Sequence, residues 1–275
     1  APAHGQMWIA GEYREPLARA GLDSFEAVMS SDQGELLRTM PDRENWRLEL
    51  AEGDARRAMY LKRHRQRSLA HWLRARLRIG PGATAGRTEA ENAVHLQQSG
   101  IDAMRLVAYG ERLRRDGLAE SFVLTEELAG FTQLDYFLRQ RFPPAAEQSH
   151  RDRQLERLSR NVADMAARFH RAGFNHRDFY CCHFFIRERR LGEFEVRLID
   201  LQRVERRRRL RRRWIVKDLA QLAYSAPSER ITCTRRMAFF KRYLGVRRLL
   251  PGDKRLIRQV LAKQRSLVRR HGAHP

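Results

Sequence analysis

The stretch between Leu155 and Asp200 constrains the fold more than any other part of the chain. Apolar residues recur at its start with spacings of 3, 4, 3 and 4, which predicts a helix with one buried stripe. The stripe consists of Leu155, Leu158, Val162, Met165 and Phe169. Gly173 stands where a left-handed residue would end this helix. After an irregular segment, residues 194–199 read as a strand that ends at Asp200. The pattern predicts a long helix, a polar loop and a strand in succession.

The polar loop and the end of the strand both carry acidic residues. His176-Arg177-Asp178 follows the helix, and Asp200 lies 22 residues after Asp178. Phosphoryl transfer from ATP needs one carboxylate to orient or deprotonate the acceptor hydroxyl and another to hold Mg²⁺ against the phosphates. This order is typical of the catalytic loop and the metal-binding aspartate of protein kinases. His-Arg-Asp alone is also an ordinary polar loop, and only the spacing to Asp200 favours catalysis.

Three features upstream fit the same chemistry. Lys62 ends a predicted strand, where a kinase places the lysine that binds the α- and β-phosphates, and it is one of only five lysines. Glu89 opens a predicted helix 27 residues later and is the expected partner carboxylate, with Glu91 as the alternative. An apolar strand then ends where a hinge would lie, so the backbone of Glu126 and Leu128 is expected to hold adenine.

The front of the chain reads as a small antiparallel sheet. Short apolar runs between turn-formers predict strands over residues 25–62, beginning with a hairpin of residues 25–29 and 35–37. One helix is expected from Thr88 to about Gln98, where Thr88 and Glu91 offer a capping box.

The back of the chain reads as mostly helical, with one β-ribbon and with Asp253 as the N-cap of the last helix. A loop is expected to begin at residues 143–146. We therefore expect an α+β chain with a β-rich N-lobe at 1–128 and a mostly helical C-lobe at 129–275.

Charge narrows the class of partner. The chain has 55 Lys and Arg against 33 Asp and Glu, a formal net charge of +22, which indicates an anionic partner. It has no apolar run long enough for a transmembrane helix, and its first residues do not resemble a secretory signal. Three cysteines argue against a disulfide framework and favour a reduced, cytoplasmic setting.

Together these residues resemble the lipopolysaccharide core kinases, which phosphorylate heptose or Kdo sugars of the inner core. The resemblance spans roughly residues 25–225. It rests on Tyr60-Leu61-Lys62, Val123-Leu124-Thr125-Glu126-Glu127-Leu128, Asn175-His176-Arg177-Asp178, His183-Phe184, Ile199-Asp200-Leu201 and Lys217-Asp218-Leu219, among shorter pieces. It implies a protein-kinase-like bilobal fold, ATP and Mg²⁺ as cofactors, and a functional core of Lys62, Asp178 and Asp200.

Position 183 departs from the ordinary kinase pattern. His183 stands where protein kinases carry a metal-binding Asn, and imidazole is a poorer Mg²⁺ ligand than an oxygen. The lipopolysaccharide kinases share this feature, so we expect His183 beside Asp200 at the metal. His176 is expected to support the catalytic loop, and Asp218 to brace it from the following helix.

An arginine run directly follows Asp200. Eight of the eleven residues 203–213 are arginine. The run is either a solvated loop or an acceptor-binding element. In the second case Arg206, Arg207, Arg208 and Arg209 would bind the phosphates and carboxylates of an anionic glycolipid at the cytoplasmic face of the inner membrane. Only 17 residues separate Asp200 from Asp218, none of them Ser, Thr or Tyr, which disfavours a protein-kinase activation segment.

Other classes remain open. The chain could act on another small or lipid-linked acceptor, or be a pseudokinase that docks an acidic protein. An Arg-rich nucleic-acid-binding protein would interleave aromatic residues with the arginines, and the run has none before Trp214, so no nucleic-acid partner is expected. Cys181, Cys182 and His183 lack a fourth zinc ligand, and buried reduced cysteines are the better interpretation.

Overall fold

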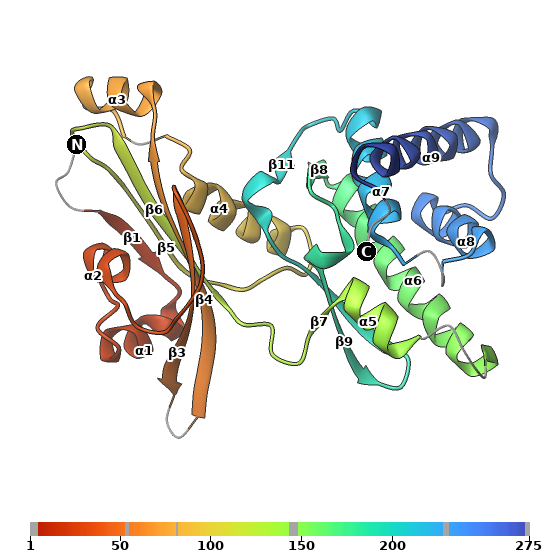
Figure 1. Cartoon of the computed structure of the whole chain (residues 1–275), viewed down its shortest axis with the longest axis horizontal. Coiled ribbons are helices and arrows are strands. Elements are labelled where there is room, and N and C mark those ends of the chain that lie inside the picture. The colour runs from red at the N-terminus through yellow and green to blue at the C-terminus, as the bar shows by residue number, and fades with distance from the viewer. Residues whose placement is uncertain (1–4, 53–54, 81, 143–147, 228–230, 273–275) are drawn as a thin grey trace. The chain divides into compact units, whose positions relative to one another are not determined.

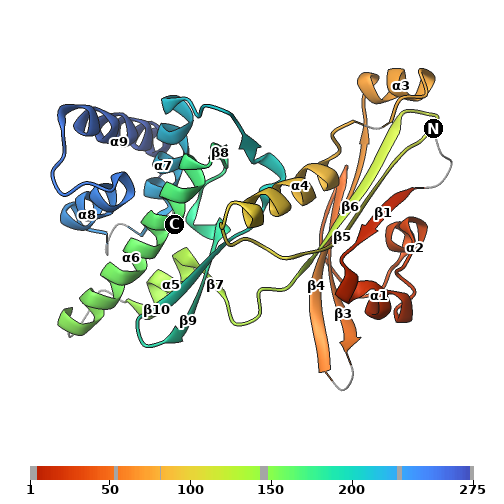
Figure 2. The same ribbon diagram turned by 180° about the vertical axis from the view of Figure 1, so that it is seen from behind.

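The computed structural model describes residues 5–52, 55–80, 82–142, 148–227 and 231–272. It forms two compact units (Figures 1 and 2). The first unit contains residues 1–95 and 104–128, and the second contains residues 96–103 and 129–275. In the described ranges, no helix is both long and apolar enough to cross a membrane.

The first unit is built on a six-stranded antiparallel sheet in the order β1-β5-β6-β4-β3-β2 (Figure 1). Its strands are β1 (Gln6–Ile9), β2 (Glu35–Met40), β3 (Arg43–Glu52), β4 (Ala55–Arg67), β5 (Leu106–Leu113) and β6 (Leu118–Glu126). Its helices are the 3-10 turn η1 (Gly11–Tyr13), α1 (Arg14–Arg19), α2 (Phe25–Ser30), α3 (Leu69–Arg76) and most of α4 (Ala85–Gln98). Strands β2, β3 and β4 lie in or overlap the stretch 25–62 where a small sheet was expected, and β6 is the apolar strand expected before the hinge. The prediction that Lys62 ends its strand is wrong, because β4 continues to Arg67 and Lys62 lies inside it.

The predicted strand at 25–29 is wrong, because this segment is helix α2. The Ser24 hydroxyl oxygen accepts the backbone N–H of Ala27 at 3.2 Å and caps the helix. Phe25, Val28 and Met29 follow at helical spacing, and all three are buried in the core against the sheet. Their spacing of three and four is the helical signal that the short apolar run concealed.

Helix α4 also begins earlier than expected. Thr84 caps it, since its hydroxyl oxygen accepts the N–H of Arg87 at 3.3 Å. The predicted capping box of Thr88 and Glu91 does not form, because Glu91 pairs with Arg87 one turn before it at 2.7 Å. A capping box and an i,i+4 ion pair both place a glutamate near the start of a helix, so a sequence does not distinguish them. In this structure Thr84 is the cap and Glu91 belongs to the ion pair.

The second unit is mostly helical. Its helices are α5 (Leu134–Arg141), α6 (Gln148–Arg171), α7 (Arg212–Ser225), α8 (Cys233–Leu244) and α9 (Pro251–His271), with the 3-10 turns η2 (Cys181–His183) and η3 (Leu201–Arg203). Its strands are β7 (Thr132–Gln133), β8 (Phe174–Asn175), β9 (Phe184–Arg190), β10 (Glu193–Leu198) and β11 (Glu205–Arg206). They form a three-stranded sheet, β10-β9-β7, and a short β11-β8 pair, where a single ribbon was expected.

Two further expectations concern segment ends. Asp253 is not the N-cap of α9; it sits three residues inside and its carboxylate accepts the backbone N–H of Leu250 at 2.9 Å. An acidic residue is favourable at either position, since both lie next to the unpaired N–H groups at the helix start. The loop expected at 143–146 lies outside the described residues.

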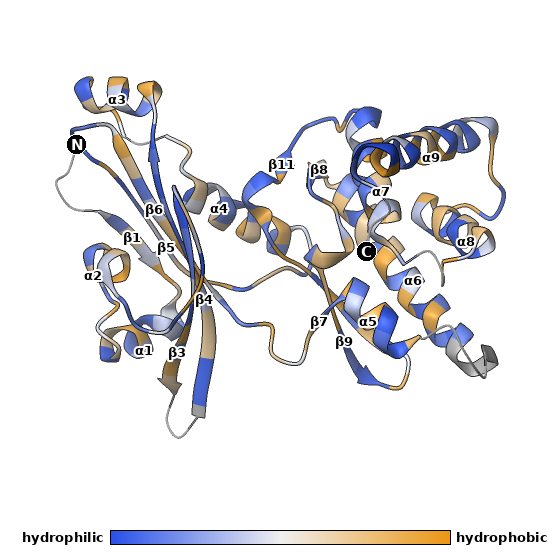
Figure 3. Cartoon of the chain, in the orientation of Figure 1, coloured by the Kyte–Doolittle hydropathy of each residue, from blue (hydrophilic) through white to orange (hydrophobic). Residues whose placement is uncertain are grey.

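An aromatic core supports the loop between α6 and β9. The predicted apolar stripe of α6 is buried throughout, and α6 shows both orange and blue segments in Figure 3. At its end, Phe169 stacks on Phe174 and on Phe179 with centroid distances of 5.5 Å each. Phe179 in turn meets Phe184 edge to face at 4.7 Å. The polar loop is therefore anchored by buried rings on both sides of Asp178.

The end of α6 requires glycine. Gly173 has φ +87°, and a Cβ at this position would lie 2.3 Å from the backbone oxygen of Arg207. The Gly173 carbonyl accepts the N–H of Arg207 at 2.9 Å, which joins the end of α6 to the segment after Asp200. The left-handed end of this helix is as predicted.

Candidate active site

Asp178 is carried by a loop that Asp218 of α7 braces. The fully buried Asp218 carboxylate accepts the backbone N–H of His176 at 2.7 Å and that of Arg177 at 3.1 Å. Arg177 has φ +71°, a strained conformation for a residue with a Cβ. Two charge-assisted hydrogen bonds to consecutive N–H groups offset this strain and fix the turn that presents Asp178. The expected brace by Asp218 is present.

The same helix continues the brace along the loop. The amide oxygen of Gln221 accepts the N–H of Phe179 at 3.1 Å, and the hydroxyl oxygen of Ser225 accepts that of Cys181 at 2.8 Å. Asp218, Gln221 and Ser225 lie three and four residues apart, so they share one face of α7. Four loop N–H groups are thus satisfied from one helix face. The sequence analysis missed the last two residues, although their helical spacing from Asp218 was visible.

His176 is neutral at physiological pH. Its ring is completely buried, and burial together with the neighbouring His183 ring lowers its pKa to about 4. Its Nε2–H donates to the carbonyl oxygen of Ile199 at 3.1 Å, and its ring stacks on His183 at 5.5 Å. His176 therefore ties the loop to the strand end that leads to Asp200.

His183 lies between the two aspartates. Its Nδ1 is 2.6 Å from the backbone oxygen of Asp178, and its Nε2 is 3.7 Å from a carboxylate oxygen of Asp200. A carbonyl oxygen only accepts, so Nδ1 carries the proton and a neutral ring keeps its lone pair on Nε2. Asp200 has φ +56°, the left-handed region. The structure thus brings His183 next to Asp200, with a ring nitrogen suited to a cation.

Arg203 directly contacts Asp178, which the sequence analysis did not foresee. One guanidinium nitrogen lies 2.7 and 3.0 Å from the two carboxylate oxygens of Asp178. Arg203 is half exposed, but its neighbours Leu201 and Val204 are buried and hold η3 in place. The Arg177 guanidinium pairs with Glu205 at 2.6 Å and secures the same segment. The guanidinium of Arg203 is therefore held against the carboxylate of Asp178, the candidate base.

A second cation lies near Asp178. Lys217 precedes Asp218 on α7 and is half-buried; burial lowers its pKa, while the attraction of Asp178 opposes that shift. Asp178 thus sits in a basic environment made by Arg203 and Lys217. Such an environment suits an anionic reactant beside the candidate base.

In the first unit, Lys62 pairs with Glu89. The Lys62 ammonium nitrogen is 2.7 Å from a carboxylate oxygen of Glu89, whose side chain is fully buried. Glu91 is exposed and pairs with Arg87, so the structure selects Glu89 of the two predicted partners. Among the described residues, the second carboxylate oxygen of Glu89 is buried without a hydrogen bond.

The predicted hinge follows β6. The N–H of Glu126 donates to the carbonyl of Arg105 at 3.0 Å and that of Glu127 to the carbonyl of Ala58 at 2.9 Å. The Glu126 side chain pairs with Arg57 at 3.0 Å. Within the described part of the chain, no backbone carbonyl accepts the N–H of Leu128. Leu128 therefore keeps a donor of the kind that adenine needs.

The four arginines predicted to bind the acceptor differ in their surroundings. Arg206 lies over the Phe174 ring at 5.3 Å. Arg207 lies over the Trp214 ring at 5.3 Å and contacts Glu205. Arg208 and Arg209 are exposed, and neither has an ion pair or hydrogen bond within the ranges that the structure describes.

Known proteins similar to this chain identify its family. The model of the lipopolysaccharide kinase (Kdo/WaaP) family matches residues 29–243. The chain belongs to this family. It is therefore a kinase of the lipopolysaccharide inner core, and as a kinase it uses ATP.

Named relatives cover nearly the whole of this lipopolysaccharide kinase. The lipopolysaccharide core heptose(I) kinase WaaP of Pseudomonas aeruginosa is 32% identical over 262 residues, covering 92% of this chain and 90% of the relative. WaaP of Escherichia coli K12 is 30% identical over 269 residues, covering 94% and 97%. A solved structure of WaaP in complex with acyl carrier protein superimposes with a TM-score of 0.70 and 30% identity, over 95% of this chain and 99% of that one. These matches confirm the predicted family and α+β fold.

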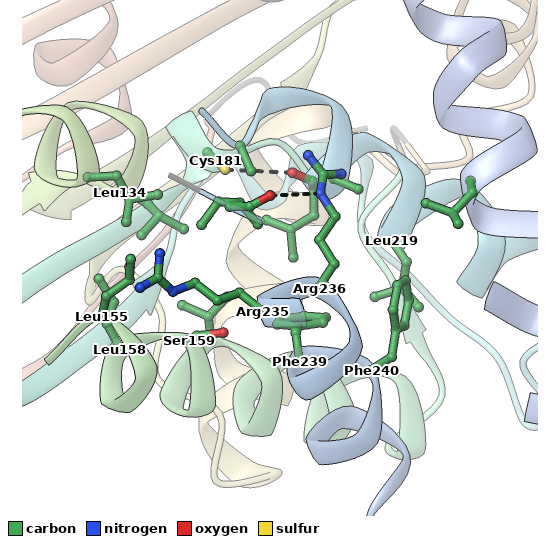
Figure 4. A pocket seen from close by; sticks show the side chains of 17 residues that line it. Leu134, Leu155, Leu158, Ser159, Cys181, Leu219, Arg235, Arg236, Phe239 and Phe240 are labelled. Atoms are coloured by element: carbon green, nitrogen blue, oxygen red, sulfur yellow. Dashed lines mark hydrogen bonds between the residues drawn. The ribbon is translucent and has the colours of Figure 1, made fainter. Parts of the chain in front are cut away.

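The second unit of this lipopolysaccharide kinase also contains an apolar pocket, shown in Figure 4. Side chains from helices α5 to α9 line it, including Leu134, Leu158, Leu219 and Phe239. Cys181 closes one side, with its thiol 3.8 Å from the carbonyl of Leu222. Burial raises the pKa of Cys181 to about 12, so the thiol is neutral, as expected for a buried reduced cysteine. The sequence showed no sign of this pocket, because its lining comes from five separate helices, α5 to α9.

The buried His176 predicts a specific pH dependence of stability. Its pKa is about 4 in the folded protein and about 6.5 when unfolded, so below pH 6.5 the unfolded chain binds the extra proton. Stability falls as the pH drops from 6.5 towards 4, and this group alone should remove about 2 kcal/mol between pH 7 and pH 5. In His176→Gln, the free energy of unfolding measured by urea titration should depend less on pH by that amount. Parallel pH curves for the two proteins would contradict the buried, neutral histidine.

Proposed function

We propose that this lipopolysaccharide kinase transfers the γ-phosphoryl group of ATP to a hydroxyl of a heptose in the inner core. The heptose is favoured over Kdo because the named relatives are heptose(I) kinases. The single observation that carries the proposal is Asp178, a partly exposed carboxylate on a loop whose backbone is fixed by Asp218.

In this reaction Asp178 is the base. The acceptor oxygen attacks the γ-phosphorus, the bond from phosphorus to the β,γ-bridging oxygen breaks, and ADP leaves with that bond's electron pair. The hydroxyl proton passes to the carboxylate of Asp178. His176 holds the loop to the strand end through Ile199 and takes no part in the proton transfer, since its Nε2–H is already donated.

Asp200 fits Mg²⁺. Its carboxylate is a hard oxygen donor of the kind Mg²⁺ prefers, and His183 offers a weaker second donor through Nε2. When bound, Mg²⁺ would offset the negative charge of the phosphates. The left-handed backbone at Asp200 and the His183 ring orient the carboxylate for this purpose.

In the first unit, Lys62 would bind the α- and β-phosphates, with Glu89 holding its ammonium group in place. The backbone carbonyl of Glu126 and the N–H of Leu128 would bind the adenine ring. A buried carboxylate under a lysine is a costly arrangement, and a phosphate-binding role accounts for its presence.

On the acceptor side, we assign anion binding to Arg203, Arg208 and Arg209. Arg203 bonds Asp178 through one nitrogen, and its remaining donors can reach a phosphate or carboxylate next to the accepting hydroxyl. Arg206 and Arg207 lie against aromatic rings and contribute charge from that position. The lipid-linked acceptor implies a site of action at the cytoplasmic face of the inner membrane.

The two aspartates should be separable by experiment. Asp178→Asn should reduce turnover by about 10²-fold or more while leaving Mg·ATP affinity unchanged, because the base does not hold nucleotide. Asp200→Asn should instead abolish the Mg²⁺ dependence of ATP binding, measured by calorimetry. Loss of nucleotide affinity in Asp178→Asn, or unchanged Mg·ATP binding in Asp200→Asn, would contradict these roles.

Arg203 should act on the acceptor. Losing one charge-assisted contact costs about 1.5–3 kcal/mol, so Arg203→Met should raise the KM for a phosphorylated core oligosaccharide about tenfold or more, with the KM for ATP unchanged. The effect should shrink for an acceptor without anionic groups. Arg190→Met, which removes an exposed arginine of β9, is the matched control. An equal loss with charged and uncharged acceptors would refute the assignment.

A second proposal concerns an acidic protein partner. The solved relative is a complex with acyl carrier protein, and this chain combines a charge of +22 with an apolar pocket in its second unit. We propose that it too binds an acidic carrier protein, with the acyl chain in the pocket of Figure 4. The pocket is lined almost entirely by apolar side chains, and the charged residues among them are Arg235, which pairs with Asp152, and Arg236.

The carrier itself provides the test of this partner. In calorimetric titrations, the acylated carrier should bind this kinase at least about tenfold more tightly than the same carrier without the acyl chain, because methylenes gain free energy on entering an apolar pocket. Salt should weaken both complexes. Equal affinities of the two carrier forms would show that the acyl chain does not enter the pocket. If neither form bound, the proposal of a carrier protein as partner would be wrong.

A further inference from the structure

Helix α3 of the first unit turns its apolar face outwards. At 100° per residue, Leu69, Trp72 and Leu73 of α3 and its C-cap residue Leu77 fall within an arc of about 140°. None of the residues of α3 is buried, and His71 and Ala75, on the opposite side, are the only half-buried ones. The usual arrangement, with the apolar face towards the protein, is therefore inverted.

Large apolar side chains are strongly exposed in α3 and in the residues directly after it. Five of the fourteen large apolar side chains that are exposed in the described part of the chain lie between Leu69 and Ile79. Leu69 is 73% exposed and Leu77 is 63% exposed. Figure 3 shows orange segments on α3, which stands at the end of the sheet beyond β4. A contiguous exposed patch of this kind marks an interaction surface.

Helix α3 is firmly placed. Its first turn is capped by Ser68, whose hydroxyl oxygen accepts the N–H of His71 at 3.2 Å. Its backbone packs on the turn between β5 and β6, where a Cβ on Gly117 would lie only 2.6 Å from the Cα of Trp72. The apolar side chains thus project from a fixed support, and their exposure does not result from a frayed end.

The charges around this face have one sign. No Asp or Glu occurs between Asp54 and Glu89, whereas Arg74, Arg76 and Arg78 are all exposed. The Arg76 guanidinium lies over the Trp72 ring at 4.9 Å, so a cation stands within the apolar arc. Tryptophan and arginine beside exposed leucines form the pattern of an interfacial helix, whose rings enter the lipid while the guanidinium groups meet the phosphates.

We propose that α3 docks this kinase on the surface of an anionic membrane. Leu69, Trp72, Leu73 and Leu77 enter the boundary between headgroups and acyl chains, and the arginines bind lipid phosphates. The choice of a membrane over a protein rests on the proposed function in one respect, namely that the acceptor is lipid-linked. A helix of eight residues binds weakly by itself, so its effect is to raise the local concentration of the kinase at its acceptor.

The first test uses vesicles and a matched pair of variants. Wild type should sediment with vesicles that contain phosphatidylglycerol and much less with phosphatidylcholine alone, and salt should weaken the binding. The double variant Leu69→Ser/Leu77→Ser should bind at least about tenfold less, since two apolar side chains are lost from the interface. Leu191→Ser, in the turn between β9 and β10 and also 63% exposed, should bind like wild type.

The second test locates the contact. Lipids brominated along their acyl chains should quench part of the tryptophan fluorescence of the bound wild type, and Trp72→Phe should remove that quenching although Trp8, Trp46 and Trp214 remain. Quenching that persists without Trp72 would assign the contact to another surface. Unchanged vesicle binding by Leu69→Ser/Leu77→Ser, or no binding by wild type, would overturn the proposal.

Measurements of kinase activity distinguish a failure of this proposal from a failure of the proposed function. The double variant should phosphorylate a soluble, delipidated core oligosaccharide with the kcat/KM of wild type, yet show a higher KM for lipopolysaccharide embedded in vesicles. If no acceptor is phosphorylated by wild type, the proposed function fails while the vesicle results still decide the role of α3. If instead wild type forms a dimer that Leu69→Ser/Leu77→Ser abolishes, with vesicle binding unaffected, the face contacts a second copy and the membrane proposal is wrong.

Discussion

The buried carboxylate of Asp218 is the interaction on which the second unit depends. A buried charge is costly unless several donors surround it, and here the donors are the N–H groups of His176 and Arg177, with the His170 ring at 3.4 Å. His170 is itself fixed by the Tyr243 hydroxyl at 2.8 Å. The network connects α6, α7 and α8 to one turn of the loop. The packing of the helices therefore sets the position of the loop that carries Asp178.

The segment after Asp200 plays a complementary part. Arg203 places a cation on Asp178, and the short β8–β11 pair holds that segment against the loop. In the proposed function, this ion pair holds the base in position before an acceptor binds. An anionic acceptor would share the same guanidinium, so Arg203 would recognise its charge next to the hydroxyl that Asp178 activates.

Short-range signals made much of this molecule predictable. The stripe of α6, the left-handed Gly173, the Lys62–Glu89 pair and the His176–Asp178 loop with Asp200 all follow from spacing along the chain or from the family resemblance. The failures have local causes. Helix α2 was taken for a strand because a six-residue helix is too short to show a clear period. The caps were placed four residues late at α4 and three residues late at α9. The contact of Arg203 with Asp178 and the apolar pocket could not be found, because each depends on tertiary contacts between separate segments. The outward orientation of the apolar face of α3 could not be predicted for a related reason. A sequence shows an amphipathic pattern without showing which side of the helix faces the protein.

We propose that this chain is an active kinase for a heptose hydroxyl of the lipopolysaccharide inner core. This can be tested by incubating the purified protein with γ-labelled ATP, Mg²⁺ and dephosphorylated inner-core oligosaccharide. Mass spectrometry and phosphorus NMR then locate the label. We expect one phosphate ester per acceptor, on a heptose hydroxyl, formed at a rate that depends on the acceptor concentration. Nucleotide binding without transfer to any sugar, or label found only on the protein or on water, would contradict it.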